Sequence, residues 1–519
     1  MKPASLLALA LAAGVQAGAF AQAPRVVAGS NAPAGAPTLA GEVLLTPRQF
    51  AQLVAIRSPE VRYSRLAVDV AGALSNAESA LYEAVLFGSL RGTDVSRQRT
   101  TEERLVSAAT LPVLDERTRN LETGVRQRLP TAGEVSLSYR VQRRRANIIQ
   151  QATAGFRDTE WTGALVLTYK QPLLRSFGRD IVETDRRVAE LEQQVQWMQF
   201  RQQVLKSMAD SLNLYWQMRR AEVALRLREE AVNNARRIST DVDARIQGGR
   251  APAANLIEVN SNVVSRQTDF TRAQQAVREG EARMLTALAI PAGAAVRVRT
   301  AEAPLPAVAE PEPLDRVVGR ALEQWPPYLV SRLRLEQGRL RLNFARNQKL
   351  PQLDLTASYT GNGYSNERGD VQRLVTNDRY PEWVVGVNFE MPIEGNGRAT
   401  GQFDAQALRV QQSELELEAI RTSLSNDLAQ RRDDLEAAMR LVNQLQDELK
   451  LRQQLVDSER ERYNLGVGQL SQWLLRENDL LEARQRHAEA EMRVQQARVA
   501  WLFAQGGLLD EFDIALRSE

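Results

Sequence analysis

Apolar residues recur along this chain with two different spacings, and each spacing predicts a different element. Over long segments they return every three or four positions, as between Val188 and Trp216. That is the spacing of a helix packed against neighbours along its length. Over short segments apolar and polar residues alternate one by one, which is the period of a β-strand with one apolar face. The sequence therefore predicts a mixed α and β protein that is mostly helical.

Helices are expected in the same order in each half of the chain. The two longest, at about 178–246 and 398–465, would each measure roughly 100 Å. A helix of that length cannot bury itself in a compact domain and needs neighbours along its length. An antiparallel coiled coil meets that need, and shorter helices laid end to end beside the long ones would complete a hollow cylinder, an α-barrel. The shorter helices are expected at about 46–82, 251–290, 314–349 and 469–505.

Four segments between these helices alternate in the manner of strands. They lie within Gly133–Arg143, Leu165–Pro172, Gln352–Thr360 and Trp383–Pro392. Segments of about 9–11 residues with one apolar face are typical of outer-membrane β-barrels. A half-buried sheet packed on a helix gives the same alternation, so both interpretations stay open for the strands alone. On the membrane interpretation, the lipid-facing residues are Leu137, Tyr139, Leu165, Leu167, Leu355, Tyr359, Val385, Val387 and Phe389.

The chain repeats one plan twice. The segment Arg245–Gly249 returns as Arg462–Gly466, and Ser58–Val61 is echoed farther downstream, by Trp325–Tyr328. The second pair lies farther apart than the first, so the first copy carries about 50 additional residues in its middle, and the long period indicates a duplicated domain and not a solenoid. The predicted division is a signal peptide (1–21), an N-terminal extension (22–45), a first repeat (46–290), a Pro/Ala-rich linker (291–313), a second repeat (314–507) and a C-terminal tail (508–519).

The first 21 residues have the features of a secretory signal peptide. Lys2 precedes a short apolar stretch, Ala4–Val15, and Ala19-Phe20-Ala21 resembles a cleavage site. An uncleaved anchor is the alternative. No run of 18 or more apolar residues follows, so an exported protein of this sequence would have to cross a membrane with β-strands.

The number of strands bears on assembly. Four strands cannot close a barrel, because the smallest bacterial barrels use eight, and open sheet edges are not tolerated in hydrocarbon. A membrane-spanning form therefore requires several chains that share one transmembrane β-barrel, and two-fold and three-fold assemblies both remain open on this argument. Residues 83–100 and 119–129 are weakly strand-like, and the sequence does not decide whether they join the barrel.

Composition narrows the chemistry. The 519 residues include no Cys and one His, which argues against disulfides, a lipoprotein cysteine, thiolate chemistry and His-based metal or triad sites. The net charge of +3 comes from 67 basic and 64 acidic residues that are interleaved, which gives no sign of nucleic-acid binding. We find no nucleophile–base pair and no cofactor site, and so expect no enzyme. Arg143–Arg145 could bind lipid A phosphates or form a solvated loop, and His487 is expected to face solvent.

The whole chain after the signal peptide resembles the TolC-type outer-membrane efflux family. The likeness rests on the duplicated plan, on the stretch Leu167–Gly178, and on the turn Arg462–Gly466 with its weaker first copy. The resemblance implies a homotrimer with a 12-stranded barrel in the outer membrane of a Gram-negative bacterium and a long periplasmic α-barrel. It also implies a periplasmic adaptor protein and an inner-membrane pump of the RND, ABC or MFS type as partners. The chain would then conduct small molecules or polypeptides passively.

The turns between paired helices are the expected periplasmic tips. Small residues suit such turns, and Pro252 suits the first turn of the following helix. The resemblance places adaptor docking at Gly248, Gly249, Arg250, Gly466, Val467 and Gly468.

The resemblance also bears on the gate. Members of the family carry a ring of carboxylates just beyond the tips, but the matching positions here hold Asn255, Gln472 and Leu475. A different lock could come from ion pairs or stacking, although solvated helix faces explain the same residues. The candidates for that lock are Arg245, Glu258, Tyr463 and Arg476, with Arg250 and Glu477 beside them.

A second function remains possible on the sequence. A periplasmic coiled-coil adaptor or structural protein that never enters the bilayer would also contain long paired helices. The two functions differ in the strands, because a conduit needs one apolar face per strand toward lipid whereas an adaptor would have a compact β-domain.

Overall fold

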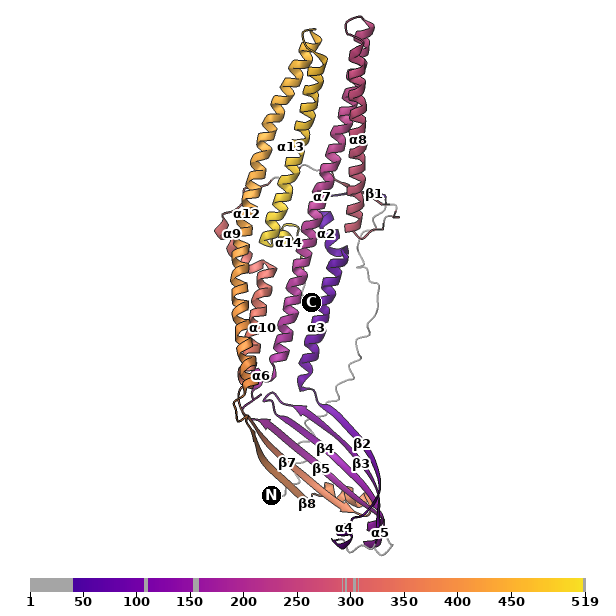
Figure 1. Ribbon diagram of the computed structural model, residues 1–519, viewed down its shortest axis with the longest axis vertical. Helices are drawn as coiled ribbons and strands as arrows, with labels where there is room; N and C mark the ends of the chain where they lie inside the picture. The colour runs from indigo at the N-terminus through magenta and orange to yellow at the C-terminus, as the bar shows by residue number, and fades with distance from the viewer. Residues whose placement is uncertain are drawn as a thin grey trace.

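The computed structural model describes residues 41–106, 111–152, 158–291, 293–294, 296–301, 305–306 and 308–516. The predicted signal peptide, 1–21, lies outside these residues. The molecule is long and narrow, with helical hairpins at one end and a β-sheet at the other (Figure 1). The fold is mixed and mostly helical, as the sequence predicts.

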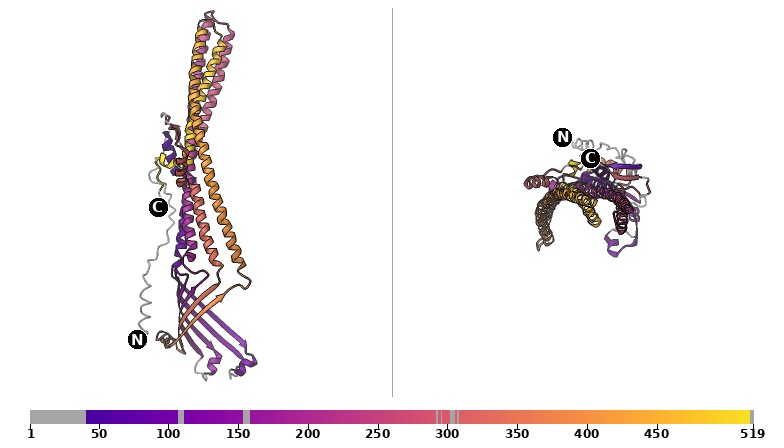
Figure 2. Two further views of the ribbon diagram at one scale, coloured as in Figure 1. Left: turned by 90° about the vertical axis from the view of Figure 1, so that its left-hand side faces the viewer. Right: turned by 90° about the horizontal axis from the view of Figure 1, so that it is seen from above.

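Two long helical hairpins form the end opposite the sheet. In the first, α7 (Thr184–Gln247, 64 residues) pairs with α8 (Ala254–Ala287). In the second, α12 (Gly397–Asn464, 68 residues) pairs with α13 (Leu470–Gln505). Closer to the sheet, α3 (Pro59–Ser79) packs on α7, and α10 (Pro326–Gln348) packs between α7 and α12. Seen along the long axis, the helices follow an arc (Figure 2).

The first helix of each repeat is two helices, which corrects the continuous segments 46–82 and 314–349 of the sequence analysis. The first repeat begins with α2 (Pro47–Arg57) before α3, and the second begins with α9 (Leu314–Gln324) before α10. Pro59 and Pro326 open the later helices, and proline lacks the N–H that would continue the preceding helix. Because of these breaks, α2 and α9 lie at the waist of the molecule, which is the middle of its long axis (Figure 1).

The largest apolar core lies at this waist. It joins Phe50 of α2 to Met208, Leu212 and Tyr215 of α7, all 2% exposed or less. Three segments that the sequence analysis treated as extension, linker and tail contribute to it. Strand β1 (Gly41–Leu45) pairs in parallel with β6 (Val296–Thr300), and α14 (Leu508–Glu511) buries Leu508 completely.

Six antiparallel strands, and not four, form the sheet, in the order β2-β3-β4-β5-β7-β8. The weakly strand-like segments do join it, as β2 and β3, so the expected count of four strands per chain is wrong. Short helices α4 (Thr101–Val106), α5 (Asn147–Ala152) and α11 (Arg368–Thr376) lie near its far end (Figure 1). The strands are β2 (Val85–Gln98), β3 (Val113–Arg128), β4 (Glu134–Ala146), β5 (Thr159–Pro172), β7 (Gln352–Ser365) and β8 (Tyr380–Glu390).

The additional hairpin β2–β3 accounts for the longer first repeat. The starts of the first helices, Pro47 and Leu314, lie farther apart in the chain than the ends of the long helices, Gln247 and Asn464. The additional length falls between α3 and β4, where β2, α4 and β3 are inserted. The second repeat passes from α10 to β7 through only Lys349, Leu350 and Pro351.

Candidate functional site

Both helical hairpins end in the same turn. At the first tip, the Gly249 N–H donates to the Ile246 carbonyl over 2.9 Å, and the Arg250 N–H donates to the Arg245 carbonyl over 2.7 Å. At the second, Gly466 and Val467 donate in the same way to Tyr463 and Arg462, over 3.1 and 3.0 Å. This is the Schellman motif, which requires a left-handed residue after the C-cap.

Glycine supplies that conformation at both tips. Gly249 has φ +70° and Gly466 has φ +79°, a region that side chains with a Cβ rarely adopt. Gly468 is required for a different reason, because a Cβ there would lie 2.7 Å from the Tyr463 backbone nitrogen. Gly248 has an ordinary φ of −80° and is not constrained in this way.

The two tips of one chain are joined by Arg245. Its guanidinium donates to Asn464 Oδ1 over 2.7 Å, lies 4.9 Å from the centre of the Tyr463 ring, and pairs with Asp241 at 3.0 Å. Tyr463 in turn stacks against Trp473, with ring centres 5.3 Å apart. Burial raises the pKa of the Tyr463 hydroxyl, although Arg245 acts in the opposite direction. Arg245 of α7 thus links the end of α12 to the α7–α8 hairpin.

A hollow of about 830 Å³ lies between the tips. Arg245, Asn255, Glu258 and Tyr463 line it, so the structure brings together four of the seven candidate gate residues. Gln472 and Leu475 lie exposed on α13 and do not line this hollow. Arg476 is also absent from its wall. It pairs with Asp479 at 3.2 Å, and Asp479 pairs with Arg452 of α12 at the same distance.

The two tips differ in the side chains they present. Leu465 and Val467 at the second tip are 72% and 71% exposed. The matching positions of the first tip hold Gly248 and Arg250, which are also exposed. The backbone of the two tips is therefore alike, whereas their surfaces are apolar in one case and small and basic in the other.

The sheet has one apolar and one polar face. Its register aligns six apolar residues side by side, one on each strand: Leu86, Val125, Leu137, Leu167, Tyr359 and Trp383. Because alternate residues share a face, all nine residues expected to face lipid lie on this side. The opposite face carries ion pairs between Arg140 and Glu122 and between Lys170 and Asp354, each at 3.0 Å.

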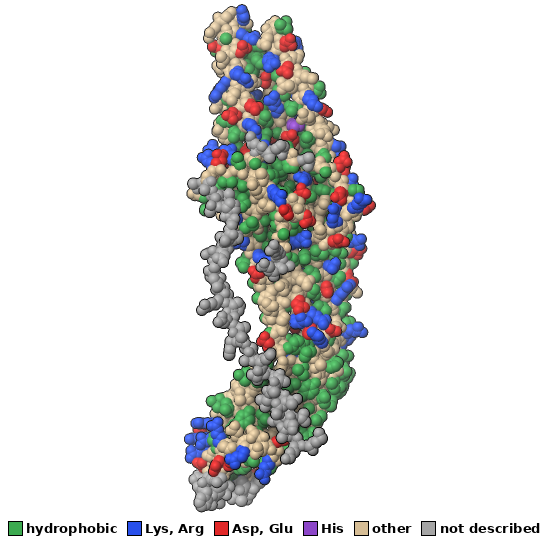
Figure 3. Space-filling view, turned by 180° about the vertical axis from the view of Figure 1, so that it is seen from behind, with side chains coloured by type: hydrophobic (Ala, Val, Ile, Leu, Met, Phe, Trp, Pro, Cys, Tyr) green, Lys and Arg blue, Asp and Glu red, His purple; other side chains and the backbone are tan. Residues whose placement is uncertain are grey.

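The far end of the apolar face is covered and charged. Helix α11 buries Val371 and Val375 over Gly163 and Gly363, where a Cβ would lie 2.6–2.7 Å from atoms of Val371. Arg143 lies 5.6 Å from the centre of the Trp161 ring. Figure 3 shows acidic and basic side chains gathered at this end, with hydrophobic ones between it and the helices.

The other two arginines of the Arg143–Arg145 run have carboxylate partners within the chain. Arg144 pairs with Glu116 at 2.7 Å, and Arg145 pairs with Asp158 at 2.5 Å. His487 differs from expectation: its side chain is only 14% exposed and lies 3.9 Å from Glu491, because α13 packs on both α12 and α7.

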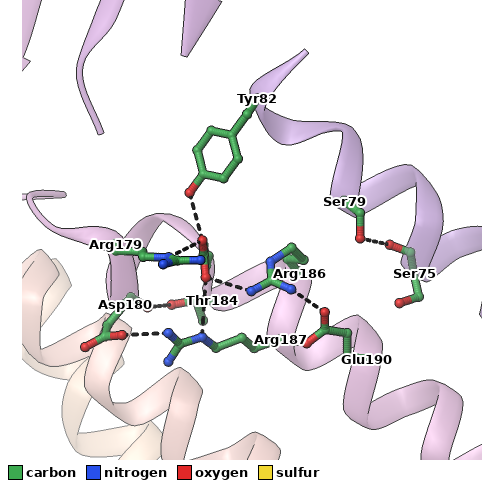
Figure 4. Close-up of polar contacts among 10 residues, drawn as sticks. Ser75, Ser79, Tyr82, Arg179, Asp180, Thr184, Arg186, Arg187 and Glu190 are labelled. Atoms are coloured by element: carbon green, nitrogen blue, oxygen red, sulfur yellow. Dashed lines mark hydrogen bonds and ion pairs between the residues drawn. The ribbon is translucent and has the colours of Figure 1, made fainter. Parts of the chain in front are cut away.

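Where the sheet meets the helices, three arginines surround a buried carboxylate (Figure 4). Glu183, 1% exposed, accepts hydrogen bonds from Arg179 and Arg186, both at 2.7 Å, and from the Tyr82 hydroxyl at 3.1 Å. Arg187 lies 3.7 Å away. Burial opposes ionisation of Glu183, but these hydrogen bonds outweigh it and lower its pKa to about 2. The cluster thus links Tyr82, which follows α3, to the start of α7.

Sequence reasoning missed this cluster. Three arginines and three carboxylates within Arg179–Arg187 are typical of an ordinary solvated helix start. Ser176, with φ +67°, and Gly178, with φ +99°, mark an unusual turn just before the cluster. Within the described ranges, no helix has both the length and the apolar character needed to cross a membrane.

Comparison with known proteins places this arrangement among characterised folds. Residues 317–507 match the family model described as outer membrane efflux protein. Protein CyaE of Bordetella pertussis is 24% identical over 311 residues, which cover 58% of this chain and 62% of CyaE. The match therefore spans less than two thirds of that relative.

Solved structures share the fold over nearly the whole chain. CusC superposes with a TM-score of 0.65 at 15% identity, covering 91% of this chain and 95% of its own. The outer membrane protein VceC of Vibrio cholerae gives 0.62 at 13%, covering 89% and 96%. The open-state outer membrane channel MtrE of Neisseria gonorrhoeae gives 0.61 at 16%, covering 89% of each chain. At these identities the likeness shows the fold.

Proposed function

We propose that this chain, which has the fold of the TolC-type outer-membrane channels and carries an outer membrane efflux protein domain at residues 317–507, is an outer-membrane channel for passive export. The observation that carries the proposal is a sheet with one continuous apolar face and two unpaired edges among the described strands, set on long helical hairpins. Such a face suits lipid and such edges require partner strands.

Copies of the same chain are the proposed partners at those edges, as a homotrimer. On α3, Tyr63, Leu66, Val70 and Leu74 form a stripe that is 60–77% exposed. On α12, which lies on the opposite side of the molecule, two leucines seven residues apart are also exposed, Leu408 at 61% and Leu415 at 67% (Figure 1). Stripes of this spacing pack against other helices, so α12 of one copy would cover α3 of the next. The arc of helices then closes into an α-barrel.

The tips would face a periplasmic adaptor, and through it an inner-membrane pump. Gly248, Gly249, Arg250, Gly466, Val467 and Gly468 are the proposed docking positions, since they are the outermost residues of both hairpins and carry few large side chains. Their shared backbone turn supports docking at both tips. The cargo, small molecules or polypeptides, would pass between the inner polar faces without chemical change.

The proposed gate centres on Arg245 and Tyr463. Arg245 holds the second tip to the first by the hydrogen bond to Asn464, so its release would let the two hairpins separate. Asn255 and Glu258 line the hollow beside this contact. The other candidate gate residues, Gln472, Leu475 and Arg476, do not line this hollow.

Planar-bilayer recording of the purified oligomer tests the proposal, together with extraction of native membranes. We expect discrete ion-conducting steps, a native mass of three chains, and retention in carbonate-washed membranes with release by detergent. The alternative, a periplasmic coiled-coil adaptor or structural protein, predicts release by carbonate and no conductance. A water-soluble single chain that forms no pore would overturn the proposal.

A further inference from the structure

We propose that the inserted hairpin β2–β3 is part of the barrel wall, so that three copies close a barrel of 18 strands in which β8 of one copy pairs with β2 of the next. The inference rests on the proposed trimeric channel and departs from the 12 strands that the sequence resemblance implies. It concerns the surface that joins the copies and the width of the exit.

The ladder of the inserted hairpin is complete. Strand β2 pairs with β3 along its full length, from Val85 opposite Arg126 to Gln98 opposite Val113. Strand β3 then pairs with β4 from Glu116 to Arg128. With 14 and 16 residues, β2 and β3 exceed the length of about 9–11 residues that a tilted strand needs to span a bilayer. A hairpin folded onto the outside or into the lumen would not continue the ladder of β4.

The inserted strands also extend the apolar row of the other four, although Val85 and Phe87 of β2 lie on the opposite, polar side. On the apolar side, Leu86 and Val125 extend the row that continues through Leu137 and Leu167. On the polar side, Glu122 of β3 pairs with Arg140 of β4 at 3.0 Å. An apolar face that stops at β4 would indicate an appendage, whereas this one continues to the sheet edge and indicates a wall.

Strand direction fits closure. All neighbouring strands in the sheet are antiparallel, and a chain that contributes an even number of them ends on a strand opposite in direction to its first. Strand β8 of one copy therefore meets β2 of the next in antiparallel order, as a closed membrane barrel requires. Inserting one whole hairpin preserves this order, and inserting a single strand would not.

The helical edges point to the same partner. Strand β2 follows α3 and strand β8 precedes α12, and these are the helices that carry the exposed apolar stripes. The contact of α12 with the next copy's α3 thus brings β8 and β2 together. Because barrel diameter grows roughly in proportion to strand number, the exit would be about 1.5 times as wide as a 12-stranded one.

Cysteine cross-linking in native outer membranes tests the strand order. The sequence contains no cysteine, so only the introduced cysteines of this chain can form disulfides with one another. Val385→Cys on β8 is combined in turn with Gly88→Cys, Leu90→Cys and Gly92→Cys on β2, and separately with Leu137→Cys, Tyr139→Cys and Val141→Cys on β4. After oxidation we expect a ladder of covalent dimers and trimers for at least one β2 position and for none on β4.

Leu137→Cys with Leu167→Cys is the matched control. These residues are opposite each other on β4 and β5 of one chain, so they should react without producing an oligomer band. Covalent oligomers through β4 would overturn the 18-stranded barrel and leave the channel standing. A native trimer with no β2 cross-link would do the same, as would 12 strands in an image of the purified oligomer. Absence of any oligomer would instead remove the proposed function itself.

Discussion

The two repeats agree at their tips and disagree in their sheets. Both hairpins end in the same Schellman turn, with left-handed glycines at Gly249 and Gly466, and both repeats place two helices before their first strand. Length has been added only between α3 and β4. A sheet can accept another hairpin sideways because its edge is a ready template for pairing. The long helices that carry the tips have kept nearly the same length, 64 residues in α7 and 68 in α12.

The long helices differ as well. Helix α7 buries aromatic side chains such as Phe200, Tyr215 and Trp216 at the waist, whereas the core around α12 rests on leucines such as Leu424, Leu428 and Leu435. The first repeat therefore anchors the chain internally. Both repeats also leave apolar side chains exposed, such as Leu66 on α3 of the first and Leu408 and Leu415 on α12 of the second.

The largest expected effect comes from charge on the apolar face of either repeat. Leu137→Arg or Val385→Arg should cost about 2–4 kcal/mol near the middle of the bilayer and strongly reduce the trimer recovered from outer membranes. Val384→Arg is the matched control for β8, because this neighbouring valine lies on the polar face. Equal trimer yields for Val384→Arg and Val385→Arg would contradict the assignment of faces.

The next largest effect on stability is expected from removing the buried carboxylate of the first repeat, Glu183. Glu183 has no counterpart in the second, because the first turn of α12 contains no acidic residue. Its pKa is lowered from 4.5 to about 2, so its contribution is present above pH 4.5 and is lost as the pH falls toward 2. We expect Glu183→Gln to lower the free energy of unfolding by about 3 kcal/mol at neutral pH.

Thermal unfolding of the detergent-solubilised protein at several pH values measures this effect. The wild type should lose stability between pH 4.5 and 2, and Glu183→Gln should lose less over the same range. Glu190→Gln, at an exposed partner of Arg186, is the control and should change little. Parallel pH profiles for the wild type and Glu183→Gln would remove Glu183 as the cause.

Substitutions at the tip glycines test whether the two repeats dock alike. Gly249→Val and Gly466→Val place a branched side chain at positive φ, with a local cost of about 1–2 kcal/mol, and should block export without dissociating the trimer. Gly319→Ala, in α9 and away from the tips, is the control and should leave export unchanged, because an added Cβ there would meet no atom within 4 Å. Export assays beside native gels decide the matter. Normal export in both valine variants would argue against docking at the tips.

The smallest effect is expected at the contact between the tips. Arg245→Ala removes one hydrogen bond and one cation–π contact, together worth about 1 kcal/mol, and should raise the open probability of the channel roughly five-fold. Tyr463→Phe keeps the ring and should behave nearly as the wild type. Single-channel recording compares the two. An unchanged open probability in Arg245→Ala would exclude this lock.

Much of the fold follows from the sequence, and the exceptions have physical causes. Helical periodicity predicts the long hairpins because each long helix is packed on its neighbours along one stripe. The hairpin β2–β3 gives a weaker signal, since its outward positions include Gly88 and Gly92, which dilute the alternation of Leu86 and Leu90. The pairing of β1 with β6 joins segments that are distant in the chain, and no local pattern encodes it.

The candidate site divides in the same way. The tip glycines are predictable because a tight turn between helices needs a left-handed residue. The contact of Arg245 with Asn464 depends on how two hairpins pack, and the burial of Glu183 depends on the packing where sheet and helices meet. Charged residues in a sequence do not reveal which of them tertiary structure will remove from water.

The unlike surfaces of the two tips have a consequence for stoichiometry. In a ring of three copies, six helical ends would alternate around the axis, three bearing Arg250 and three bearing Leu465 with Val467. A partner made of six subunits would meet the same backbone turn at every tip, but side chains of two different kinds. It would then bind in two affinity classes of three, so that half-occupied complexes become a natural intermediate of assembly.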